Sequence, residues 1–114
     1  MIYLAGPYSH SDHLVMADRA HLHGAWAVHC AIQGYVVYSP IAAWDKWSHG
    51  YGLPMTWEFW RGMSLGMLRV ASELWVLKMD GWEDSEGLAE EIDLAKLCGI
   101  PRRYFSPEDY REVV

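Results

Sequence analysis

Apolar and polar residues alternate along this chain in blocks that predict strands and helices in turn. Short apolar or β-branched runs predict strands at residues 2–5, 35–38, 73–79 and 100–105. Apolar positions that recur every three to four residues predict helices at residues 12–33, 54–69 and 85–98, and residues 106–109 predict the cap of a short terminal helix. Because strands that alternate with helices favour an α/β fold, we expect residues 1–114 to form one domain. It should contain a Rossmann-like or flavodoxin-like parallel sheet of about four to five strands flanked by helices.

The segments that follow the predicted strands carry candidate ligand contacts. Residues 41–53 contain Trp44, Trp47, His49 and two glycines, and we predict a long loop there. In open parallel sheets, ligands bind outside the carboxyl ends of the strands. We therefore expect a cleft at the edge shared by residues 6–12, 39–53 and 80–85.

One carboxylate in the last long helix falls on the face that should be buried. At about 100° per residue, Glu91 lies inside the apolar arc of its helix, whereas Glu90 lies off the arc toward water. The arc consists of Leu88, Ile92, Leu94, Ala95 and Cys98. An unpaired buried carboxylate costs several kcal/mol, and such a group is commonly kept where it lines a cleft or does chemistry. Glu91 is therefore the first functional candidate, with a structural ion pair or a head group that reaches water as the alternative.

Composition and charge exclude several classes of partner. Nine Lys and Arg stand against fifteen Asp and Glu, and the net charge of −6 opposes binding of a nucleic acid polymer. Apolar runs of membrane-spanning length are missing, and the first strand leaves no room for a signal sequence. We expect no membrane partner and a cytoplasmic location.

The sequence predicts neither a metal nor an organic cofactor. The six histidines lack a converging set of ligands at metal spacing, and the phosphate loops of dinucleotide and nucleoside triphosphate sites are missing. The two cysteines, Cys30 and Cys98, lack CxxC spacing and sit in apolar helical stretches. We expect both to be reduced thiols in the core.

The two ends of the chain together resemble a known family. Residues 2–8 read Ile-Tyr-Leu-Ala-Gly-Pro-Tyr, Ser39 and Pro40 follow the second strand, and residues 84–87 read Asp-Ser-Glu-Gly shortly before Glu91. This combination resembles the nucleoside 2-deoxyribosyltransferase-like superfamily, above all its small bacterial and phage members and the related 2′-deoxynucleoside 5′-phosphate N-hydrolases. The resemblance implies an N-glycosidase or deoxyribosyltransferase. Such an enzyme cleaves or transfers the N-glycosidic bond of a nucleoside or its 5′-monophosphate through a covalent glutamyl–sugar intermediate.

The resemblance also implies roles for individual residues. Glu91 matches the nucleophile of the family, and Tyr3 matches the tyrosine that hydrogen-bonds it, although core packing alone would also explain Tyr3. Ser85 stands where monophosphate hydrolases carry a serine, which implies a phosphate site; a simple N-cap is the alternative, and both roles can coexist. The other expected substrate contacts are Gly6, Pro7, Tyr8, Ser9, Arg19, Trp44 and Gly87.

The chain departs from this family in two places. Relatives carry an aspartate in the helix before the central strand, where Ser64 stands here. The leaving base would then take its proton from Asp80, Asp84 or Asp45, or catalysis would be slow. Arginines at positions 102–103 replace an apolar strand, which predicts an exposed edge or a subunit contact.

Two other functions and an assembly state complete the expectations. A non-catalytic nucleotide-binding module would keep the pocket without turnover, and a flavodoxin-type redox carrier would need a hydroxyl-rich loop that residues 6–8 do not provide. A homodimer or higher homo-oligomer is expected because relatives close their active sites between subunits. In addition, Trp57, Phe59 and Trp60 cover more directions than one apolar stripe can bury. We expect residues 41–53 to become ordered only on assembly.

Overall fold

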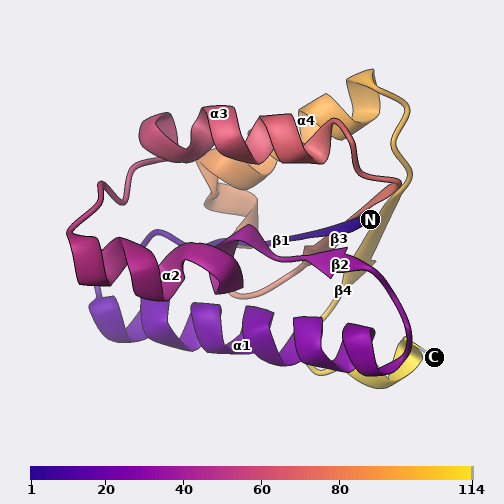
Figure 1. Ribbon diagram of the computed structural model, residues 1–114, viewed down its shortest axis with the longest axis horizontal. Coiled ribbons are helices and arrows are strands. Elements are labelled where there is room, and N and C mark those ends of the chain that lie inside the picture. The colour runs from indigo at the N-terminus through magenta and orange to yellow at the C-terminus, as the bar shows by residue number, and fades with distance from the viewer. Residues whose placement is uncertain (114) are drawn as a thin grey trace.

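The computed structural model describes residues 1–113 and contains a four-stranded parallel sheet. Its strands pair in the order β2-β1-β3-β4, with β1 at Ile2–Ala5, β2 at Val37–Tyr38, β3 at Glu73–Leu77 and β4 at Arg102–Phe105. Helix α1 (His13–Ile32) covers one face of the sheet, and α3 (Trp57–Leu68) and α4 (Glu86–Leu97) cover the other (Figure 1). The predicted α/β fold with a parallel sheet is confirmed.

Side chains of the first strand alternate between the two layers of the core. Ile2 and Leu4 pack with Trp26 of α1, whereas Tyr3 and Ala5 belong to the cluster under α3 and α4. This alternation follows from the two-residue period of a strand. It sends the Tyr3 hydroxyl toward the layer that contains the last long helix.

The segment predicted as a long loop, residues 41–53, is mostly helical. Helix α2 (Pro40–Tyr51) starts where the Ser39 hydroxyl accepts a hydrogen bond from the Ala42 N–H at 3.2 Å, and it ends at Gly52 with φ of 64°. Ser-Pro before a helix and a left-handed glycine after it are ordinary boundaries. The loop prediction was wrong because it weighed aromatic and glycine content above these caps. The further expectation, that this segment becomes ordered only on assembly, stays a prediction.

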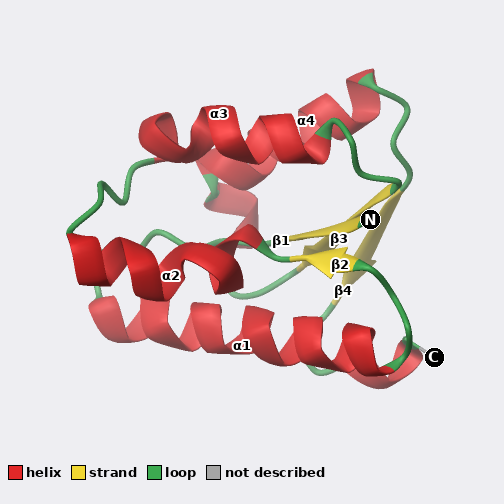
Figure 2. Cartoon of the chain, viewed as in Figure 1, coloured by secondary structure: helices red, strands yellow, loops and turns green. Residues whose placement is uncertain are grey.

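Helix α2 lies along α1 at the carboxyl end of the sheet, and the loops after β1 and β3 leave the sheet at the same end (Figure 2). Helix α3 begins after Thr56, whose hydroxyl accepts from the Phe59 N–H at 3.4 Å, rather than at Pro54. β3 ends at Leu77 and leads through the 3₁₀ turn η1 (Trp82–Asp84) into α4. The predicted terminal helix is a single 3₁₀ turn, η2 (Tyr110–Glu112).

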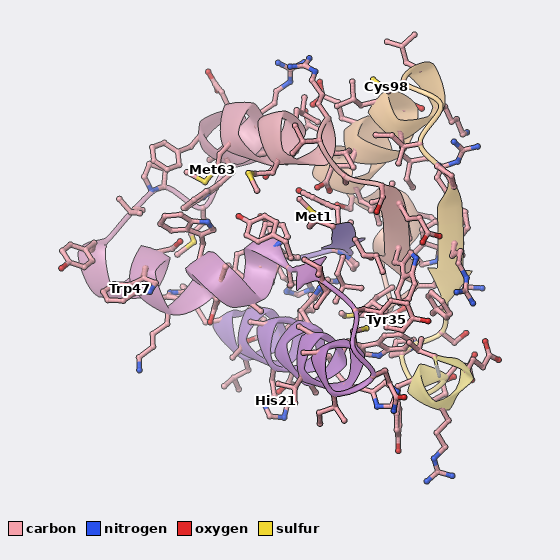
Figure 3. All side chains as sticks on the ribbon, turned by 45° about the vertical axis from the view of Figure 1, so that its right-hand side comes forward. Met1, His21, Tyr35, Trp47, Met63 and Cys98 are labelled. Carbon is pink, nitrogen blue, oxygen red and sulfur yellow. The ribbon has the colours of Figure 1, made fainter. Side chains whose placement is uncertain are left out.

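Two expectations about the surface have different outcomes. Cys30 is buried as predicted, but Cys98 lies exposed just beyond the end of α4 (Figure 3), so its placement in the core was wrong. β4 is an edge strand, and the exposed Arg103 lies over the rings of Trp75 and Phe105, at 5.1 and 4.8 Å from their centroids. Among residues 1–113, none of the helices has the length and apolar character needed to cross a membrane.

Candidate active site

A pocket of about 840 Å³ lies at the carboxyl ends of the strands. Its walls come from the loop after β1, from α2, from α3, and from the segment that runs from β3 into α4. Tyr3 is fully buried and is the one predicted site residue outside the lining. The predicted residues that line the pocket are Gly6, Pro7, Tyr8, Ser9, Arg19, Trp44, Asp80, Asp84, Ser85, Gly87 and Glu91.

Glu91 is buried, as its place on the apolar arc predicted. Only 6% of its surface is exposed, and Leu88 and Ala95 on the same side of α4 are also buried. Its carboxylate accepts a hydrogen bond from the Tyr3 hydroxyl. Burial raises the pKa of Glu91 to about 7, the bond from Tyr3 opposes that rise, and the charge of Glu90 adds to it. Glu91 is thus a carboxylate whose charged form becomes common only near neutral pH.

The partner of Glu91 is itself held from a second side. Burial, and then the negative charge of Glu91, raise the pKa of Tyr3, so the phenol keeps its proton and acts as a donor. A hydrogen bond with the Ser64 hydroxyl opposes this rise. Ser64 is buried on α3 and lines the pocket. Ser64, Tyr3 and Glu91 therefore form a polar chain that crosses from α3 through β1 to α4.

Glu90, expected to point toward water, is engaged by α3. Its carboxylate accepts from the Trp57 indole N–H at 2.5 Å and from the Arg61 Nε–H at 2.6 Å. The bond from Arg61, followed by that from Trp57, lowers the pKa of Glu90. Two adjacent glutamates on α4 thus have pKa values shifted in opposite directions.

The glycine at position 87 makes room for a protein side chain. A Cβ atom there would lie 2.8 Å from the Trp57 indole, so the ring rests directly on the first turn of α4. From the sequence, Gly87 was expected to contact the substrate. Its close neighbour in the structure is Trp57, an α3 residue that also lines the pocket.

Three of the predicted substrate contacts, among them the phosphate candidate Ser85, already have protein partners. The Ser85 hydroxyl accepts from the Leu88 N–H at 3.2 Å and caps α4, and the Ser9 hydroxyl donates to the Met55 carbonyl at 3.0 Å. Arg19 donates to three backbone carbonyls, those of Tyr8, Ser9 and Asp80, at 3.3, 3.1 and 2.8 Å. Arg19 therefore ties the loop after β1 to the loop after β3.

The charges that line the pocket are mostly negative. Glu91 is joined there by four other carboxylates, those of Asp45, Asp80, Asp84 and Glu86, whereas Arg19 is the one Lys or Arg among the lining residues described. Asp80 and Asp84 are both exposed, on the segment between β3 and α4. The pocket is thus rich in groups that accept protons or hydrogen bonds.

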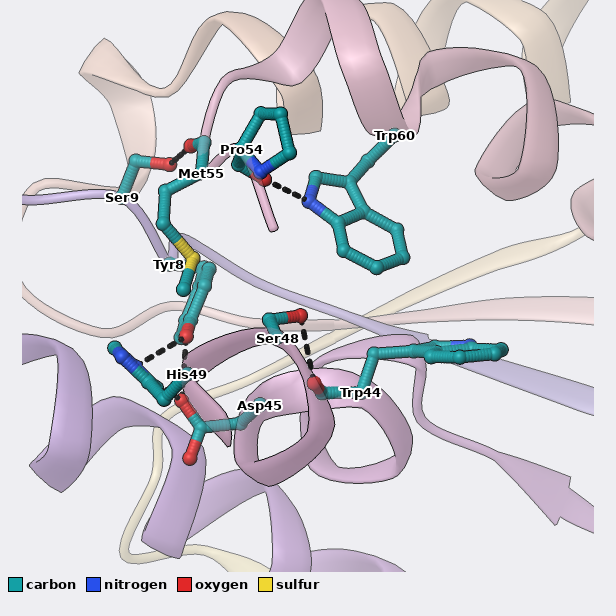
Figure 4. A network of polar contacts seen from close by, with 9 residues as sticks. All are labelled: Tyr8, Ser9, Trp44, Asp45, Ser48, His49, Pro54, Met55 and Trp60. Atoms are coloured by element: carbon teal, nitrogen blue, oxygen red, sulfur yellow. Dashed lines mark hydrogen bonds and ion pairs between the residues drawn. The ribbon is translucent and has the colours of Figure 1, made fainter. Parts of the chain in front are cut away.

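One wall of the pocket is aromatic. The Trp44 ring of α2 lies 5.7 Å from the Trp60 ring of α3, measured between centroids, and its indole N–H donates to the Tyr38 hydroxyl at 3.1 Å. The Trp60 indole donates to the Pro54 carbonyl at 2.7 Å (Figure 4). Trp44 was predicted from the sequence as a substrate contact, whereas Trp60 was named only among the aromatic residues expected to support a contact between subunits.

The sequence did not reveal a polar cluster on the α2 side. The Tyr8 hydroxyl donates to the Asp45 carboxylate, and the His49 Nε2 atom lies 3.3 Å from both of these groups (Figure 4). Asp45 and His49 are four residues apart, a spacing that places them on one face of a helix. The signal was present, but it carries meaning only once residues 40–51 are taken as helical.

A buried histidine supports the first loop from below. His23 of α1 is fully buried, and a Cβ atom at Gly6 would lie 2.6 Å from its Nε2 atom. Burial lowers the pKa of His23 to about 3, so the ring is neutral. Within residues 1–113, neither ring nitrogen has a hydrogen-bond partner, and the described residues also hold no group of three or more His, Cys, Asp or Glu suited to a metal.

Comparison with known proteins gives one family. The model of a family described as Domain of unknown function (DUF1937) matches residues 1–105. None of the curated proteins matches the sequence.

The contact between Trp57 and Gly87 can be tested with two glycine variants. Gly87→Ala should destabilise the fold by about 1–3 kcal/mol, because the new methyl group must displace the indole. Gly66→Ala on α3 is the matched control, since a Cβ there meets nothing within 4 Å. It should stabilise the helix by up to about 1 kcal/mol. Urea unfolding of both variants provides the measurement, and equal effects would contradict the packing described.

The raised pKa of Glu91 predicts how stability depends on pH. In the unfolded chain Glu91 loses its proton near its ordinary pKa of 4.5, whereas in the folded protein it does so near 7. Between these two values the folded state binds more protons than the unfolded state, so its stability falls as pH rises. Glu91→Gln removes this titration. The variant should gain stability over the natural protein on going from about pH 5 to about pH 8, by roughly 1–3 kcal/mol.

Glu90→Gln is the control for this measurement. The pKa of Glu90 is lowered below its ordinary value of 4.5, so the stability that its charged form contributes is lost only as pH falls below that value. The difference in stability between Glu90→Gln and the natural protein should therefore stay nearly constant from about pH 5 to about pH 8. Free energies of unfolding at both pH values would decide. A Glu91→Gln difference that is the same at both would show that Glu91 titrates as an exposed carboxyl does.

Proposed function

The chain belongs to the family described as Domain of unknown function (DUF1937), and from its pocket we propose a specific activity. The protein cleaves or transfers the N-glycosidic bond of a nucleoside or nucleoside 5′-monophosphate, with Glu91 as the nucleophile. The observation that carries this proposal is a buried carboxylate that lines the pocket and receives a hydrogen bond from a buried tyrosine. Burial of this kind costs free energy, and the contacts described within residues 1–113 give Glu91 no cation that would offset this cost, which is the pattern of a functional carboxylate.

The chemistry uses the two oxygens of Glu91 differently. One oxygen, held by Tyr3, stays fixed while the carboxylate attacks C1′ of the sugar; the bond between C1′ and the base nitrogen breaks and its electron pair leaves with the base. Water or a second base then attacks C1′ and releases Glu91. A pKa near 7 leaves a large fraction of Glu91 ionised at neutral pH, and the burial of Glu91 shields the intermediate.

The size and lining of the pocket suit a nucleoside. Its volume of about 840 Å³ falls in the range of small-molecule sites. Trp44 and Trp60 offer ring faces to a base, as in other sites where aromatic side chains stack on bases. No cofactor is needed for this reaction.

Two features of the pocket bear on the 5′ group of the substrate. The first turn of α4, capped by Ser85, presents backbone N–H groups and the positive end of the helix dipole, which favours a phosphate. The neighbouring carboxylates of Asp84 and Glu86 oppose one. The proposal therefore includes both the nucleoside and its 5′-monophosphate as substrates, and a comparison of kcat/KM for the two distinguishes them.

A homo-oligomer and a cytoplasmic location also stay predictions. Phe59 and Met63 on α3 are 49% and 44% exposed and can support a contact between copies, whereas Trp57 and Trp60 turn toward the pocket.

Glu91→Gln should abolish base release and leave nucleoside affinity within several-fold. The amide keeps the shape of the carboxylate and can still accept from Tyr3, but it is no nucleophile, so the rate should fall by orders of magnitude. The measurement is chromatography of free base from a panel of deoxynucleosides and their 5′-monophosphates. If the variant still released base at the natural rate, Glu91 would not be the nucleophile.

Tyr3→Phe serves as the companion variant. It deletes the hydrogen bond that lowers the pKa of Glu91, so the rise of kcat/KM with pH, centred near 7 in the natural protein, should move to higher pH.

The same panel of ligands tests the alternative function. If the natural protein binds these ligands in calorimetry but releases no base, the result would support the non-catalytic binding module.

Ser85→Asp tests whether a phosphate sits at the start of α4. The aspartate can still cap the helix, so folding should be preserved, but its charge would repel a phosphate in a partly desolvated site. We expect the ratio of kcat/KM for the monophosphate to that for the nucleoside to fall at least about tenfold, since repulsion there is worth more than about 1 kcal/mol. Ser85→Asn is the uncharged control. An unchanged ratio in both variants would place the 5′ group elsewhere.

A further inference from the structure

The polar cluster on α2 provides what the proposed reaction still lacks. Tyr8, from the loop after β1, and Asp45 both line the pocket, and the polar contacts described within residues 1–113 give the cluster no charged partner outside itself. The side chain of Asp45 is 24% exposed and that of His49 is 40% exposed. These three residues therefore stand at the boundary between pocket and solvent.

The contacts of Asp45 leave one of its oxygens available. The Tyr8 hydroxyl and His49 Nε2 both approach the Oδ1 atom, and the described contacts do not engage Oδ2 (Figure 4). Burial, and then the bond to Asp45, raise the pKa of Tyr8, which keeps its hydroxyl a donor. The hydrogen bond from Tyr8 holds Oδ1, which leaves Oδ2 as the oxygen that can exchange a proton with a ligand.

Asp45 and Glu91 reach the pocket from different layers of the fold. Helix α2 packs along α1, whereas α4 packs against α3 on the opposite face of the sheet (Figure 1). In a displacement at C1′ the nucleophile and the leaving base are on opposite sides of the sugar, so a proton for the base must come from the wall that faces the nucleophile. Asp84 ends the 3₁₀ turn η1, separated by one residue from α4, and so lies on the same wall of the pocket as Glu91.

We propose that Asp45 is the acid that protonates the leaving base, with Tyr8 and His49 as its positioning residues, an assignment that rests on the proposed function. As the bond between C1′ and the base nitrogen breaks, the proton on Asp45 Oδ2 passes to the base, which leaves neutral, and the Asp45 carboxylate remains. When water attacks C1′ of the glycosyl-enzyme, its proton passes to the Asp45 carboxylate and Glu91 leaves as a carboxylate. Atoms and charge then return to the starting state.

A comparison of two leaving groups tests this assignment. Asp45→Asn should lower kcat by about 100-fold or more on the deoxynucleoside that the natural protein cleaves fastest, because general acid catalysis contributes that much. On p-nitrophenyl 2-deoxyriboside, whose phenolate departs without a proton, formation of the glycosyl-enzyme should be nearly unaffected, and a burst of p-nitrophenol should persist. Glu91→Gln should lose both reactions, so failure of the nucleophile and failure of the acid give different patterns.

A chemical rescue supplies the second measurement and does not depend on the leaving group. Asp45→Ala opens space for a small acid, and added formate should restore part of its deoxynucleoside turnover, whereas Asp84→Ala should need no rescue. Tyr8→Phe and His49→Gln should lower kcat more than they change KM. The assignment would be overturned if the Asp45 variants lost activity on both the deoxynucleoside and p-nitrophenyl 2-deoxyriboside and did not respond to formate. It would also be overturned if Asp84→Ala, rather than an Asp45 variant, lost activity on the deoxynucleoside alone. A natural protein that cleaves no nucleoside would overturn it together with the glycosidic function.

Discussion

The site depends on keeping the Glu91 carboxylate buried in the apolar layer between the sheet and helices α3 and α4. Removing Glu91 from water raises its pKa to about 7, and the bond from Tyr3 is the main force that opposes this shift. That bond exists because β1 is a central strand whose alternation directs Tyr3 into the layer of α4. Because Tyr3 is fully buried and also bonded to Ser64, it cannot relax away from Glu91 without disturbing three elements at once. The order of the strands and the chemistry of the helix are thus coupled through one contact.

Interactions with Trp57 make the two adjacent glutamates of α4 chemically different. The indole covers Gly87 and donates to Glu90, which keeps Glu90 charged beside Arg61 at the surface. The charge of Glu90 in turn raises the pKa of Glu91. Trp57 therefore helps to fix where Glu91 sits and at which pH its carboxyl group ionises.

The sequence was sufficient where a property is local or periodic. Periodicity placed Glu91 on a buried face, and alternation of strands and helices gave the parallel sheet, because both patterns repeat over many residues. It failed for residues 41–53, where the caps at Ser39 and Gly52 outweigh the composition of the segment. It also could not show that Trp57 fills the space above Gly87, or that Tyr8 meets Asp45, because such contacts join segments far apart in the chain and depend on how layers pack. For the same reason, the sequence pattern cannot predict hydrogen bonds from a single side chain to distant backbone carbonyls, such as those that Arg19 donates.

The close approach of His23 to Gly6 has an evolutionary consequence. The imidazole occupies the volume that any side chain at position 6 would need, and the carbonyl of Leu77 closes the space from another side. Position 6 cannot enlarge by itself, and position 23 cannot shrink without leaving a hole beneath the loop that carries Tyr8. Descendants of this sequence are therefore expected to change the two positions together or not at all, so that a pair of residues separated by a whole strand-to-helix connection evolves as one unit.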